Sequence, residues 1–131
     1  MNNIKYRFGK KVVYSFDDAI KKVAEELHKE GFGVLTTIDV SATLKKKLNQ
    51  EMPPYQILGA CNPQFAHQAL EKEPSIGLLL PCNVVVRQDN TGEVYIEFMD
   101  PNAVLELVGN SEINHIADEV KKRLEKVLNA L

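Results

Sequence analysis

The sequence predicts an α+β fold, a two-layer sandwich in which helices pack on one face of one mixed sheet of about four or five strands. Three observations support this prediction. Short segments with the alternation typical of strands are spread along the chain, between segments with helical spacing. The two longest helical segments each carry one apolar stripe. The last strand-like segment alternates throughout, which indicates a sheet with one face free of helices, in contact with water or with a partner subunit.

The composition is that of a soluble globular domain. The chain has 131 residues, of which 44% are hydrophobic, so we expect one domain over residues 1–131 with one core. A net charge of −2 argues against general binding to nucleic acid or to a membrane surface. The N-terminal sequence does not resemble a signal peptide, and no segment has the roughly 20 apolar residues of a membrane span. We therefore expect a cytoplasmic protein.

The N-terminal part predicts a strand, a helix, a strand and a short helix. The first strand is expected at either Ile4–Phe8 or Val12–Tyr14, on one side of a Gly-Lys-Lys segment. Ser15 is the expected N-cap of the first helix, which ends before a glycine. Residues 33–40 alternate as a strand. Ser41 is the expected N-cap of the short helix, whose three consecutive lysines predict a solvated face, with an anion contact as the alternative.

The middle of the chain predicts a strand, a helix and a second strand. Tyr55–Cys61 and Ile76–Val86 are apolar runs with strand character. Asn62 is a favoured N-cap and Pro63 suits the first helical position, so we expect a helix from there to about Glu73. If this unit is a β-helix-β crossover, its two strands are parallel and the crossover is right-handed.

The C-terminal part begins with a hairpin turn at residues 89–92 and a returning strand, Val94–Met99. Asp100 and Pro101 predict the start of a short helix that runs to Val108. Ser111 is the expected N-cap of the last helix, whose apolar residues form a long stripe to the end of the chain.

Two Cys-Asn pairs, Cys61-Asn62 and Cys82-Asn83, are the candidate ligand-binding residues, together with His67. Cys61 is expected to end a strand directly before a helix N-terminus, where free N–H groups can bind an anion and can lower a thiol pKa. In adjacent parallel strands that start level, the two thiols would lie at similar heights. His67 is expected to be exposed or interfacial, with a proton acceptor near Cys61 as the alternative.

Several signatures of known chemistry do not occur in the sequence. It contains no glycine-rich phosphate loop, no HExxH, no CxxC and no GxSxG. The three histidines lie far apart, and two cysteines 21 positions apart do not have the spacing of a zinc ribbon. We therefore expect no metal site and no cofactor.

Four segments resemble the domain of unknown function 302 family. They are GACNP at residues 59–63, LLLPCNVVV at 78–86, GFGVLTTIDV at 31–40 and SFDDA at 15–19. The resemblance covers most of the chain and is clearest from Tyr14 to Pro101. It implies a small two-layer α/β fold, a dimer, an occurrence in bacteria and archaea, and no established activity. It assigns no catalytic residue.

Two functional hypotheses follow. The first is a non-catalytic binding or interaction module that acts as a homodimer, with a small polar pocket near the two Cys-Asn pairs for an anion or another small molecule. In its simplest form, both cysteines are small core residues and both asparagines satisfy backbone groups. The alternative is a thiol-dependent enzyme or redox sensor, in which Cys61 is the reactive thiolate, Cys82 its resolving partner and His67 a base.

Overall fold

A computed structural model describes residues 5–131 of the chain. Within them, five strands form one sheet in the order β1-β5-β4-β3-β2, and every neighbouring pair is antiparallel. The strands are β1 (Arg7–Val12), β2 (Gly33–Asp39), β3 (Tyr55–Cys61), β4 (Cys82–Gln88) and β5 (Val94–Met99).

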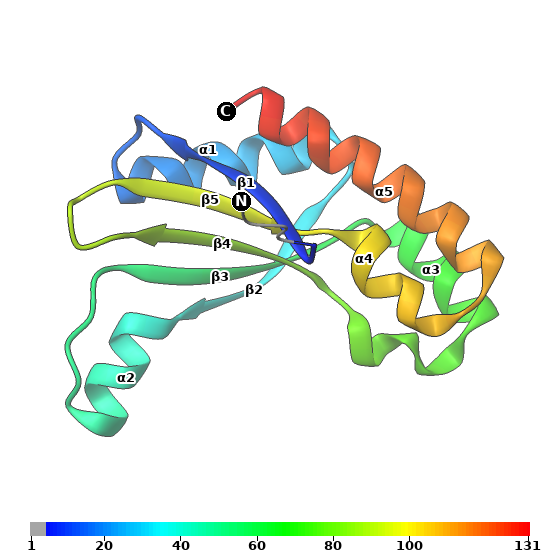
Figure 1. Cartoon of the computed structure of the whole chain (residues 1–131), viewed down its shortest axis with the longest axis horizontal. Coiled ribbons are helices and arrows are strands. Elements are labelled where there is room, and N and C mark those ends of the chain that lie inside the picture. The colour runs from blue at the N-terminus through cyan, green and yellow to red at the C-terminus, as the bar shows by residue number, and fades with distance from the viewer. Residues whose placement is uncertain (1–4) are drawn as a thin grey trace.

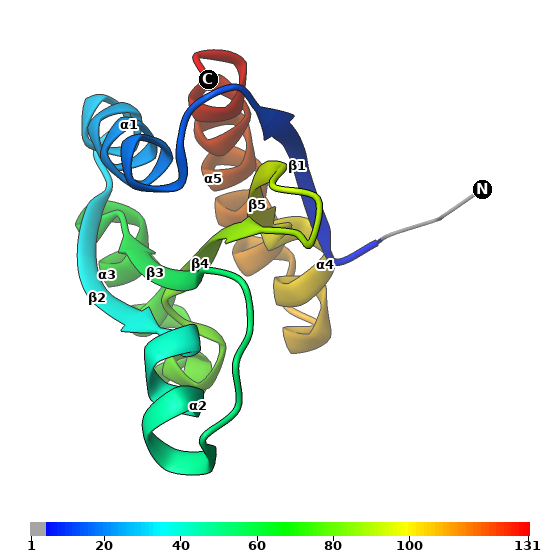
Figure 2. The same cartoon turned by 90° about the vertical axis from the view of Figure 1, so that its left-hand side faces the viewer.

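Helices form the second layer. The α-helices are α1 (Phe16–Lys29), α2 (Val40–Leu48), α3 (Pro63–Lys72), α4 (Pro101–Leu105) and α5 (Ser111–Asn129), and two 3-10 helices are η1 (Pro74–Leu79) and η2 (Glu106–Val108). Apolar residues of α1 and α5 share one core with inward residues of the sheet. Figures 1 and 2 show α2 apart from the other helices, beyond the end of the sheet. The α+β sandwich expected from the sequence is confirmed.

The strand alternation sets the two faces of the sheet. In β4, Cys82, Val84 and Val86 are buried, and in β5 the buried positions also alternate. The residues between them, such as Arg87 and Glu97, lie on the opposite face. Because α1 and α5 pack on the buried positions, this opposite face is the helix-free face of the sheet.

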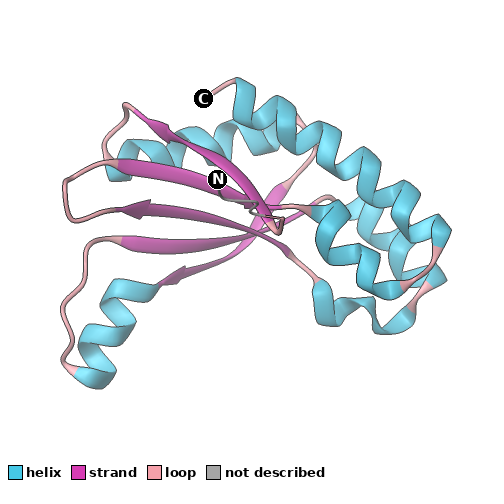
Figure 3. Ribbon diagram, in the orientation of Figure 1, coloured by secondary structure: helices cyan, strands magenta, loops and turns pink. Residues whose placement is uncertain are grey.

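The sequence analysis predicted a mixed sheet, but the sheet is antiparallel throughout the described residues. The central unit is therefore not a parallel crossover. Within Ile76–Val86, the first residues form η1 and the strand begins only at Cys82, after a cis Leu80-Pro81 bond. α3 and η1 contact each other, and Figure 3 shows them gathered at one end of the strands. The chain therefore returns to the end that it left, and β4 runs antiparallel to β3.

Most predicted helix starts are confirmed, because capping is local. The side chains of Ser15, Asn62 and Asp100 cap α1, α3 and α4. Two caps differ from the prediction. Asp39 rather than Ser41 caps α2, with the Ser41 hydroxyl donating to the Asp39 carboxylate at 2.9 Å. Asn110 rather than Ser111 caps α5.

The first strand is also longer than predicted. β1 continues through the Gly-Lys-Lys segment that was expected to divide it, and Ile4, in one of the two predicted ranges, lies outside the described residues. The reason is the close approach of β5. A Cβ at Gly9 would lie 2.4 Å from the Ile96 carbonyl oxygen, so glycine allows β1 to pair with β5 along its whole length.

Candidate functional site

The two Cys-Asn pairs do not form one pocket. In the antiparallel register, Ala60 lies opposite Cys82 and Gly59 lies opposite Asn83. Cys82 is buried under the helices, with 8% of its surface exposed. Asn83 is exposed and belongs to the helix-free face. The strand period of two therefore separates this cysteine from its neighbouring asparagine.

Cys61 and Cys82 line the same narrow cavity, whose volume is about 40 Å³. Apolar side chains such as Phe32, Phe65 and Leu105 surround them. Both thiols are free. Burial raises the pKa of Cys61, and burial together with the neighbouring Cys61 raises the pKa of Cys82 to about 11. Both shifts run opposite to the lowered pKa that is typical of a reactive thiol.

Asn62 is buried, and its side chain is used by the protein itself. Its Oδ1 accepts the N–H of Phe65 at 3.5 Å, and its Nδ2 donates to the Glu30 carbonyl oxygen at 3.5 Å. Arg123 donates to the same carbonyl oxygen at 3.2 Å. Asn62 thus joins the start of α3 to the end of α1.

His67 lies away from the thiols. It is exposed and is not among the residues that line the cavity of Cys61 and Cys82. Its Nε2 lies 3.0 Å from the Glu71 carboxylate, one helical turn further along α3. The structure places it as a surface histidine.

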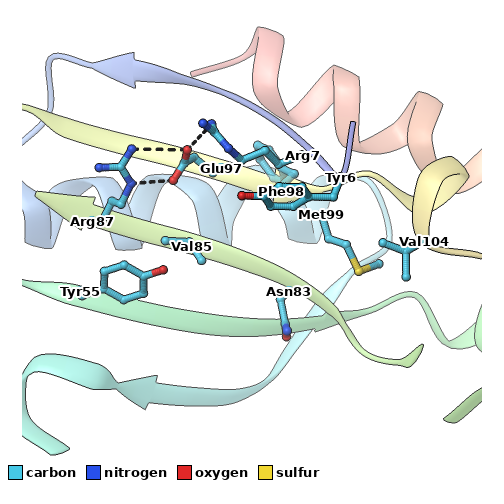
Figure 4. Close-up of a pocket in the computed structure, with 10 residues that line it drawn as sticks. All are labelled: Tyr6, Arg7, Tyr55, Asn83, Val85, Arg87, Glu97, Phe98, Met99 and Val104. Atoms are coloured by element: carbon cyan, nitrogen blue, oxygen red, sulfur yellow. Dashed lines mark hydrogen bonds and ion pairs between the residues drawn. The ribbon is translucent and has the colours of Figure 1, made fainter. Parts of the chain in front are cut away.

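A larger concave site lies on the helix-free face, with a volume of about 420 Å³. Figure 4 shows its side chains on β1, β5, β4 and β3, with Val104 of α4 at one end. Its polar side chains are Tyr6, Arg7, Tyr55, Asn83, Arg87 and Glu97, and its apolar side chains include Val85, Met99 and Val104. Of the five residues predicted from the sequence, Asn83 alone lines this site.

An ion cluster joins three neighbouring strands at this site. The Glu97 carboxylate accepts a hydrogen bond from Nε of Arg87 at 2.7 Å and another from a terminal nitrogen of Arg87 at 3.5 Å. It also forms an ion pair with Arg7. The Arg87 guanidinium lies over the ring of Tyr95, 4.5 Å from its centroid. Glu97 is 11% exposed, whereas each arginine is about one third exposed.

Sequence reasoning missed this cluster because its members are distant in the chain. Arg7 and Glu97 are 90 positions apart, and only the β1-β5 pairing brings them together. A partial signal exists in the sequence. Arg87, Tyr95 and Glu97 occupy alternate positions of the two strands of one hairpin, on the face opposite the buried valines.

The lining of the concave site combines charged and apolar groups. Its cations can hold an anion, and its apolar residues can hold an uncharged body. Within residues 5–131, no group of three or more histidine, cysteine, aspartate or glutamate side chains is arranged to hold a metal ion. No helix in that range is long and apolar enough to cross a membrane.

Comparison with known proteins gives two kinds of relative. The fluoride-specific ion channel FluC 1 of Brucella suis biovar 1 (strain 1330) is 28% identical over 88 residues, which are 67% of this chain and 34% of that protein. FluC 1 of Brucella abortus biovar 1 (strain 9-941) is also 28% identical over 88 residues, with 32% of its length covered. The chain therefore spans about a third of the curated relatives that it matches.

A solved structure is similar over nearly the whole chain. It is the crystal structure of an uncharacterized conserved protein DUF302 from Bacillus stearothermophilus, with a TM-score of 0.90 and 31% identity. The match covers 96% of this chain and 98% of that one. The model of the family described as "Domain of unknown function DUF302" matches residues 8–131. The chain belongs to the DUF302 family.

Proposed function

We propose that this chain is a non-catalytic binding module whose ligand site is the concave part of the helix-free face. One observation carries the proposal. The sheet leaves a site of about 420 Å³ uncovered, within the size range of small-molecule pockets, and lines it with arginine, tyrosine and apolar side chains. Asn83 is the member of the site that the sequence identified. The other four predicted residues have structural or surface positions.

The alternative of a thiol enzyme has less support. A reactive thiolate needs a depressed pKa, and burial moves the pKa of Cys61 and of Cys82 in the opposite direction. His67, the candidate base, pairs with Glu71 on the surface of α3. Two free cysteines are typical of a reducing compartment, which supports a cytoplasmic location.

The similarity to fluoride channels does not extend channel activity to this chain. The matched segment is about a third of each channel protein, and their remaining two thirds have no counterpart in the match. The matched segment lies within a longer protein and also makes up most of this chain. This distribution supports a module that is combined with different partners.

The partner that we propose is a second copy of the chain, joined at the β2 edge. The other edge strand, β1, carries Lys10 and Lys11, and such charges protect an edge from pairing. β2 is exposed and uncharged from Leu35 to Ile38, and these two residues are 67% and 49% exposed. A strand that pairs with its own copy about a two-fold axis is antiparallel, as the other pairs of this sheet are.

Fragment screening by NMR tests the proposed site. We expect fragments of mixed charge to shift the backbone amides of β3, β4 and β5 and to leave those of α3 and α5 unchanged. A screen in which the shifts gather on the helical layer, or in which no fragment binds, would contradict the proposal.

A further inference from the structure

We propose that the concave site binds an organic anion, with a carboxylate or phosphate group held by Arg7 and Arg87 and an apolar or aromatic body held beside it. This inference rests on the proposed function, since it names the class of ligand for the same site. Three features support this inference: the charges of the cluster, the fixed positions of the arginines and the apolar lining of the site.

The cluster has one more cation than anion. Arg7 and Arg87 both pair with the single carboxylate of Glu97. A guanidinium has five N–H donors. Arg87 donates two of them to Glu97 and Arg7 donates one, so both arginines keep donors for another acceptor. Planar guanidinium groups of this kind bind carboxylate and phosphate groups in bidentate fashion.

The cluster holds its arginines in place before any ligand binds. Glu97 lies on β5, which is hydrogen-bonded to β1 on one side and to β4 on the other. Directly opposite Glu97 is Gly9, where a Cβ would lie 3.0 Å from Cγ of Glu97. Tyr95 supports Arg87 from beneath, through the contact of its ring with the guanidinium. Such fixed side chains lose little conformational entropy on binding.

A network that served only to join the strands would not need two arginines for one glutamate. One arginine is enough to neutralise Glu97, whereas the second leaves a net positive charge on the helix-free face. A partly exposed positive charge beside a concave surface attracts anions.

The rest of the site is suited to an uncharged body. Val85, Met99 and Val104 form an apolar patch next to the cluster, and Tyr6 and Tyr55 add two aromatic side chains. Tyrosine rings bury a large area and still accept polar neighbours. The combination favours a ligand with one charged end, rather than an inorganic ion alone.

Isothermal titration calorimetry with three probes tests this class of ligand. The probes are 1-naphthyl phosphate, 1-naphthalenemethanol and inorganic phosphate. We expect saturable binding of 1-naphthyl phosphate at the site, and affinities at least about ten-fold weaker for the neutral alcohol and for inorganic phosphate, because each lacks one of the two recognised parts.

Variants locate the binding. Arg87→Met and Arg7→Met should each weaken 1-naphthyl phosphate binding at least about ten-fold, the effect of losing a charge-assisted hydrogen bond. Asn83→Asp adds a negative charge at an exposed position of the site and should weaken it at least about three-fold, so the test does not depend on the fold tolerating an arginine variant. Lys46→Met, on the exposed surface of α2, removes the same charge elsewhere and should have no effect.

The outcomes separate the two proposals. Equal affinities for 1-naphthyl phosphate and 1-naphthalenemethanol would overturn the anion class and leave the binding module standing. Equal affinities for 1-naphthyl phosphate and inorganic phosphate would overturn recognition of the body. A loss of binding in Lys46→Met as large as in Arg87→Met would show a general charge effect and overturn the site. If none of the three probes binds, the anion class fails, and the fragment screen decides the proposed function by itself.

Discussion

At the scale of single residues, the surroundings of a side chain decide its role, and the sequence shows only its type. Cys61-Asn62 and Cys82-Asn83 are the same dipeptide. In the first pair the asparagine is buried as a helix cap, and in the second it is exposed on the helix-free face. The cap was predictable because Asn-Pro before a helix is a local signal. The exposed position was not, because it depends on where β4 starts.

The buried thiol of Cys82 should make stability depend on pH in the alkaline range. Its pKa is raised to about 11. The folded protein therefore keeps this proton at pH values where the unfolded chain has lost it, and stability falls as the pH rises between the two pKa values. Between about pH 8.5 and pH 10, we expect the free energy of unfolding to fall by roughly 1–2 kcal/mol more in the wild type than in Cys82→Ala. Urea unfolding at several pH values measures this difference.

Other groups titrate in the same range and are common to both proteins, so the difference between the two curves reports Cys82 together with its interaction with Cys61. Curves that run parallel from pH 8.5 to pH 10 would mean that this thiol is not shielded from water.

The two asparagines offer a matched pair for a stability test. Asn62→Ala removes the cap of α3 and the link to the Glu30 carbonyl, and should cost about 1–2 kcal/mol of unfolding free energy. Asn83→Ala changes an exposed side chain for which the structure gives no protein partner in residues 5–131, and should stay within about 0.5 kcal/mol of the wild type. Urea unfolding at neutral pH compares them. Equal costs would contradict the separate roles.

At the scale of elements, the number and types of the elements were largely predictable, and their directions were not. Strand alternation and capping residues are read within a few positions, so the strands around residues 33–39, 55–61 and 94–99 and the starts of three helices were found. The direction of β4 depends on η1, which turns the chain back beside α3. The apolar residues from Ile76 fit a strand as well as a helix, so periodicity did not distinguish them.

The β2 edge carries a prediction about assembly. Wild-type protein should sediment as a dimer at about 10 μM, a concentration above the Kd of a stable dimer. Leu35→Lys places a charge on the uncharged edge and should give a monomer with an unchanged circular dichroism spectrum. Leu107→Lys is the control, since Leu107 is also an exposed leucine and lies in η2, away from the β2 edge. A wild type that sediments as a monomer, or a dimer lost equally in both variants, would refute the proposed interface.

At the scale of the whole molecule, the core and the concave site lie on opposite faces of the sheet. The helical layer and the inward side chains of the sheet form the core. The helix-free face carries the concave site and its arginines. The sequence predicted this uncovered face from the alternation of the last strand. It did not predict the concave site, since Arg7, Arg87 and Glu97 come together only when β1 and β4 flank β5.

A crystal structure of the protein with 1-naphthyl phosphate tests the central claim most directly. We predict density for the phosphate within hydrogen-bond distance of Arg7 and Arg87, and density for the naphthyl group over Val85 and Met99. A complex in which the ligand sits at the cysteine cavity or on the helical layer, with the helix-free face empty, would contradict it.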